Sequence, residues 1–164
     1  MTLPAGYAFD PERDLILERE VDIAPHVVWA AWTEPKHLMH WFTPAPWKTP
    51  ECEIDLRPGG QFRTVMHGPD GEVFDNNGCY LDVVENQRLV WTSSLTQGFR
   101  PNPVSFPMHF TAIIAIEPKG SGSIYRAIVV HGKADEARQH AEMGFNDGWG
   151  KALDQLVAYM KSAT

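Results

Sequence analysis

Apolar residues near the C-terminal end of the chain recur at steps of three and four positions. They are Ala141, Phe145, Trp149, Ala152, Leu153, Leu156 and Met160. This spacing within residues 135–161 predicts an α-helix of about seven turns with one apolar face. Such a helix is stable only when another element covers that face, so the rest of the chain must supply an apolar surface.

The preceding part of the chain is typical of short β-strands joined by turns. Alternating or apolar runs predict strands over residues 15–23, 52–56, 62–67, 73–84, 89–95, 108–116 and 124–131. Pro25 and Pro35 open two short helices after the first strand. Residues 43–50 hold three prolines and are expected to form a loop. We therefore predict an α+β fold in which a curved antiparallel β-sheet of six to seven strands wraps around the long C-terminal helix.

Two glycines, Gly144 and Gly148, lie four residues apart near the apolar face of the predicted helix. Each glycine inside a helix costs about 1 kcal/mol relative to alanine. That cost indicates that another group approaches the helix closely at these positions, that the helix kinks, or that it borders an open space.

The charge balance limits the classes of partner. The chain has 164 residues and a net charge of −7, because 21 acidic side chains outnumber 14 basic ones. A nucleic-acid backbone or an anionic membrane surface would be repelled, so neither is an expected partner. The length fits one domain, residues 1–164, with a core from about residue 13 to 161.

The sequence also carries signals about the compartment. Cys52 and Cys79 are too few for a disulfide framework. No apolar stretch approaches the length of a membrane span, and the residues before Arg13 do not form a secretory leader. We therefore expect a cytoplasmic protein without membrane insertion.

Several short segments resemble a known family and occur in its order. They are residues 24–29 (APHVVW), 35–42 (PKHLMHWF), 55–62 (DLRPGGQF), 78–81 (GCYL), 88–91 (RLVW) and 148–150 (GWG), followed by Leu153 and Leu156. The set resembles the START-like, helix-grip (SRPBCC) superfamily and, within it, the family similar to the C-terminal domain of the activator of the heat-shock protein 90 ATPase. One departure is the segment Gly122-Ser123-Ile124, where the family often has Gly-Thr and a basic residue. The resemblance implies a helix-grip fold of the START and Bet v type.

The resemblance implies three classes of function, because one fold can carry several. The leading hypothesis is a cavity between helix and sheet that binds a hydrophobic or amphipathic small molecule. The second is an enzyme similar to polyketide cyclases or hydrolases that uses a cavity histidine. The third is a protein-interaction domain similar to the co-chaperone. No cofactor is expected, and a homodimer stays open.

Candidate cavity residues come from the strands and from the C-terminal segment. The expected lining is Phe62, Met66, Trp91, His131, Met143, Phe145, Gly148 and Trp149. His131 shares its strand face with Tyr125 and Val129, so it is the candidate for a polar contact or an acid–base catalyst. The alternative for His131 is a core histidine bonded to backbone. His140 is expected to face solvent.

Three further groups of residues outside the expected cavity lining are candidates for a function. The loop over residues 97–107 is a candidate lid through Phe99, Arg100 and Phe106. Glu34, His37 and His40 have a spacing that can suit a metal, but no His-Glu-x-x-His pattern is present and no metal site is expected. Polar residues at 75–77 interrupt a predicted strand, which indicates either an inward polar contact or a bulge or exposed edge.

Overall fold

In the part of the chain that the computed structural model describes, residues 3–104 and 108–163, seven strands form one antiparallel sheet. Their order is β1-β9-β8-β5-β4-β3-β2. The strands are β1 (Asp14–Val21), β2 (Lys48–Ile54), β3 (Gln61–His67), β4 (Val73–Val84), β5 (Arg88–Thr92), β8 (Thr111–Lys119) and β9 (Gly122–Val130). A small hairpin, β6 (Leu95–Thr96) and β7 (Arg100–Pro101), flanks the 3₁₀ turn η1 (Gln97–Phe99).

Four helices accompany the sheet within the described residues. They are α1 (Pro25–Thr33), α2 (Pro35–Leu38), α3 (Ala134–Glu142) and α4 (Phe145–Ala163). A proline occupies the first position of α1 and of α2, where its missing N–H costs no hydrogen bond. None of these helices is both long and apolar enough to cross a lipid bilayer.

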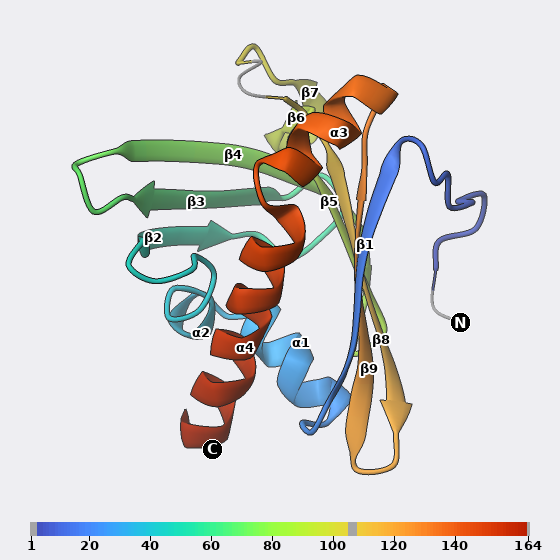
Figure 1. Cartoon of the computed structure of the whole chain (residues 1–164), viewed down its shortest axis with the longest axis vertical. Coiled ribbons are helices and arrows are strands. Elements are labelled where there is room, and N and C mark those ends of the chain that lie inside the picture. Colours follow the sequence, from blue (N-terminus) through green and yellow to red (C-terminus); the bar gives the residue numbers. More distant parts are fainter. Residues whose placement is uncertain (1–2, 105–107, 164) are drawn as a thin grey trace.

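The sheet bends around α4, which confirms the predicted fold class. Figure 1 shows β2, β3 and β4 turning away from β1, β8 and β9, with α4 running along the concave side. Phe145, Leu153, Leu156 and Met160 of α4 are buried in the main core. The helix periodicity therefore identified the face that packs on the sheet.

The predicted seven-turn helix is divided into two helices. Gly144 has a φ of 94° between α3 and α4, a conformation that glycine adopts without steric strain. Its N–H donates to the carbonyl of Ala141 and ends α3. Of the three explanations for the glycine cost, a break in the helix therefore applies at Gly144.

The predicted loop over residues 43–50 was wrong at its C-terminal end. Strand β2 begins at Lys48 and includes Pro50. This strand is at the edge of the sheet, and its pairing with β3 shifts register between Lys48 and Glu51. Proline is tolerated at such an edge because no neighbouring strand needs its N–H.

Candidate functional site

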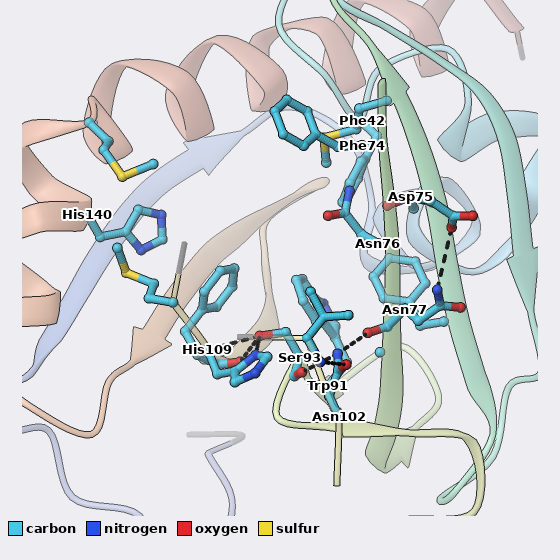
Figure 2. Close-up of a pocket in the computed structure, with 18 residues that line it drawn as sticks. Phe42, Phe74, Asp75, Asn76, Asn77, Trp91, Ser93, Asn102, His109 and His140 are labelled. Atoms are coloured by element: carbon cyan, nitrogen blue, oxygen red, sulfur yellow. Dashed lines mark hydrogen bonds between the residues drawn. The ribbon is translucent and has the colours of Figure 1, made fainter. Parts of the chain in front are cut away.

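Two adjoining hollows lie between the helices and the inner face of the sheet. Their volumes are about 350 Å³ and about 710 Å³. Six residues line both of them: Phe42, Met66, Phe74, Asn76, His140 and Met143. The shared walls make the two hollows parts of one site, within the size range of small-molecule pockets. Figure 2 shows the smaller hollow and the side chains around it.

Strands β3 and β4 supply one wall through the alternation of their side chains. Met66 pairs with Phe74 and Thr64 with Asn76, so these four side chains project from the same face of the sheet. They all line the smaller hollow. Arg63, the neighbour of Thr64, projects from the opposite face, where its Nε donates a hydrogen bond of 2.9 Å to Oδ1 of Asp75.

The first half of β4 pairs with a strand on one side only. Residues 73–79 pair with β3, whereas β5 pairs with β4 only from Cys79 onward. At the branch point, a Cβ on Gly78 would lie 2.9 Å from the carbonyl oxygen of Thr92, so glycine permits the close approach of the two strands. The predicted exposed edge at residues 75–77 is therefore present. Asn76 is at the same time an inward polar contact.

The helix wall leaves room beside Gly148. A Cβ at this position would meet no atom within 4 Å, and Gly148 lines the larger hollow. Phe145 and Trp149 flank it with ring centroids 5.2 Å apart. Of the three explanations for the glycine cost, the structure supports a helix that borders open space at this residue.

Two histidines link the hollow to the backbone of Arg13, the residue that precedes β1. His131 is 4% exposed, and its Nδ1 lies 2.9 Å from the carbonyl oxygen of Arg13. Its Nε2 lies 2.9 Å from Nδ1 of His140. His140 lines both hollows, whereas His131 is behind it. The expectation that His140 faces solvent was wrong because the break at Gly144 places α3 over the end of the sheet.

The surroundings of His140 favour its neutral form. Desolvation by burial lowers its pKa to about 4, and the nearby His131 adds to this shift. The ring centroids of Phe110 and Phe145 lie 5.0 Å and 5.4 Å from that of His140. An aromatic environment of this kind gives the imidazolium ion no compensating charge, so the ring is uncharged at neutral pH.

Acid should destabilise the protein through His140. Between pH 6.5 and about 4, an unfolded chain binds a proton on this ring whereas the folded protein does not. The unfolded state therefore holds more protons, and the free energy of unfolding falls as the pH decreases through this window, by up to about 2 kcal/mol for a partly solvated ring. Urea unfolding of the wild type and of His140→Phe across this window measures the effect. The variant should lose less stability on acidification; parallel pH curves would contradict the assignment.

Seven of the predicted lining residues lie at the two hollows. Phe62 and Trp91 line the smaller hollow; Phe145, Gly148 and Trp149 line the larger one; Met66 and Met143 line both. His131 lines neither and contacts His140 instead.

The sequence reasoning missed several wall residues. Phe42 and Phe74 line both hollows, and Trp47 stacks on Phe74 with ring centroids 5.8 Å apart. The alternation of Phe74, Asn76 and Gly78 was an available signal for this wall. Trp47 follows two prolines in an irregular segment, where no periodicity indicates its direction.

Phe99 and Arg100, two of the three candidate lid residues, are not at the hollows. Phe99 packs over the turn before β3, since a Cβ on Gly59 would lie 2.8 Å from its ring. Arg100 is exposed, and neither residue lines the site. Asn102 and Val104 from the same segment do line the smaller hollow. Phe106 lies outside the described residues.

His37 in α2 and His40 just after it pack against Tyr159 of the C-terminal helix. Nδ1 of His37 lies 3.1 Å from the hydroxyl of Tyr159, and His40 stacks on the same ring at 4.6 Å. Oε1 of Glu34 lies 3.9 Å from Nε2 of His37. Across residues 3–104 and 108–163, no three His, Cys, Asp or Glu side chains are grouped to hold a metal ion.

Comparison with known proteins identifies related chains. Residues 22–161 match the family described as Activator of Hsp90 ATPase homolog 1-like protein. A crystal structure from Nitrosomonas europaea is 42% identical, with a TM-score of 0.90, and the match covers 94% of this chain and 98% of that one. No curated protein matches.

Two more distant solved structures share the fold. A protein from Arthrobacter aurescens is 22% identical with a TM-score of 0.79, over 92% of this chain and 87% of that one. The AHSA1 protein from Silicibacter pomeroyi is also 22% identical, with a TM-score of 0.68, over 92% of this chain and 99% of that one.

Proposed function

We propose that this chain, which belongs to the Activator of Hsp90 ATPase homolog 1-like protein family, binds a hydrophobic or amphipathic small molecule in the two adjoining hollows. Domains of this superfamily commonly bind hydrophobic ligands. The observation that carries the proposal is the space that α4 leaves unfilled on the concave side of the sheet.

The walls have the chemistry that such a ligand needs. Aromatic and aliphatic side chains dominate both hollows, and the polar side chains on the walls they share are those of Asn76 and His140. Burial of an apolar ligand against these walls releases about 25 cal/mol per Å² of apolar surface. A few placed polar groups in an apolar cavity fix the orientation of a ligand.

The geometry favours binding over the cyclase or hydrolase alternative. Both ring nitrogens of His131 already have partners, so neither is available to a substrate. His140 has a pKa of about 4, far below the value near neutrality that suits a general base. Burial also raises the pKa of the Cys52 thiol to about 11, which disfavours a nucleophilic thiolate.

Three of the exposed large apolar side chains also fit a ligand site. Phe74, Val104 and Met143 are exposed, and all three line the smaller hollow. The protein-interaction alternative requires an apolar patch in place of a pocket, whereas these side chains form the margin of one.

Native mass spectrometry of the gently purified protein, followed by organic extraction, tests the proposal. We expect a co-purifying apolar compound, or one-to-one binding of the neutral dye Nile red after extraction. A protein that carries no compound and binds no Nile red would contradict the proposal. Capture of a chaperone by such a protein would favour the protein-interaction alternative.

A further inference from the structure

We propose that His140 makes the site selective for uncharged apolar molecules that carry a hydrogen-bond donor, such as a hydroxyl group. This inference rests on the proposed function, and it names the class of ligand that the hollow prefers. It follows from the hydrogen-bond chain that joins Arg13, His131 and His140.

The first step of the chain fixes the proton on His131. A backbone carbonyl oxygen can only accept a hydrogen bond, so Nδ1 of His131 must carry the proton that it donates to Arg13. The backbone N–H of His131 donates to the same carbonyl oxygen at 3.1 Å, which anchors the residue to the chain just before β1. In the neutral ring of His131, Nε2 is therefore an acceptor.

The second step fixes the proton on His140. Since Nε2 of His131 accepts, Nδ1 of His140 must donate across the 2.9 Å contact. The neutral His140 then has its lone pair on Nε2. No hydrogen bond joins this nitrogen to any of the described residues. His131 acts as a positioning residue that selects the tautomer of His140.

Asn76 supplies a second polar group to the same space. Figure 2 shows His140 on the helix side of the pocket and Asn76 on the β4 side, with the cavity between them. The side chain of Asn76 projects inward next to that of Thr64. The amide offers both a donor and an acceptor to a polar group at the other end of a ligand.

This arrangement discriminates between ligands of one shape. A hydroxyl group donates to Nε2 of His140, whereas a plain hydrocarbon leaves that acceptor buried without a partner. A carboxylate has no proton to donate, and its charge would be buried opposite a lone pair. A site that hydrogen-bonds a ligand hydroxyl group discriminates strongly against analogues without that group. A hydrophobic pocket discriminates much less against analogues that lack one methylene.

Calorimetric titration at neutral pH with 2-naphthol, naphthalene and 2-naphthoate tests the inference, because the three share one ring system. We expect the wild-type protein, once any co-purified compound has been removed, to bind 2-naphthol at least about tenfold more tightly than either analogue. His140→Phe should bind naphthalene and 2-naphthol alike. His26→Phe, the same substitution at an exposed residue of α1, should keep the wild-type preference.

Nitrogen-15 NMR of the wild-type histidines tests the tautomer without any ligand. We expect His140 to carry its proton on Nδ1 and 2-naphthol to shift the Nε2 resonance. A proton on Nε2 of His140, or equal affinity for all three compounds, would overturn the selectivity and leave the proposed function standing. Failure of all three compounds and of Nile red to bind would overturn both.

Discussion

Replacing Gly148 with phenylalanine should strongly weaken ligand binding while the protein stays folded. The new side chain would enter the larger hollow, because a Cβ at this position meets no atom within 4 Å. It would occupy the space beside Phe145 and Trp149 that the proposed ligand needs. We expect the affinity for Nile red to fall by at least about tenfold, equivalent to about 1.4 kcal/mol.

Gly148→Ala is the matched control for this experiment. A methyl group removes little space, and alanine is a better helix former than glycine by about 1 kcal/mol. The control should therefore bind Nile red and unfold at a higher temperature than the wild type. Undiminished binding by Gly148→Phe, with its fold verified by circular dichroism, would show that the ligand lies elsewhere.

Replacing Gly60 with alanine should cause a severe loss of stability. A Cβ on Gly60 would lie 1.9 Å from the carbonyl oxygen of Asp55 and 2.9 Å from that of Arg57. Both contacts are with backbone, so no side chain can rotate away to relieve them. The Gly60 carbonyl also accepts a hydrogen bond from the N–H of Tyr80, which ties this turn to β4. We expect a loss of at least about 3 kcal/mol in the free energy of unfolding, at the upper end for single substitutions.

Urea denaturation of Gly60→Ala beside Gly132→Ala measures this effect. At Gly132 the nearest contact of a new Cβ is the carboxylate of Glu136 at 3.6 Å, an ordinary van der Waals distance. The Gly132 variant should be close to wild type in stability. A loss below about 1 kcal/mol for Gly60→Ala would mean that the turn rearranges to accept a side chain.

Local periodicity predicted the parts of the fold that depend on one segment at a time. The steps of three and four placed Leu153, Leu156 and Met160 on the buried face of α4. Alternation placed Phe62 and Met66 on one face of β3, where they line the hollow. These residues could be found because a side chain's direction follows from its position in a regular element.

The remaining features depend on neighbours that no local pattern reveals. Pro50 enters a strand because β2 is at the sheet edge, which only the strand order shows. His140 pairs with His131 because Gly144 redirects the chain between α3 and α4. The edge at residues 75–77 is exposed because β5 pairs with β4 only from Cys79 onward. Each depends on how separate elements pack together, which the pattern within one segment does not show.

Nuclear Overhauser contacts between bound 2-naphthol and methyl-labelled protein test the central claim most directly. We expect contacts from the ligand to the methyl groups of Met66 and Leu153, which line the hollow from β3 and from α4. Contacts only to Val90, Ile113 and Ile128, which form a separate apolar cluster, would contradict the claim that the ligand lies between the C-terminal helix and the sheet.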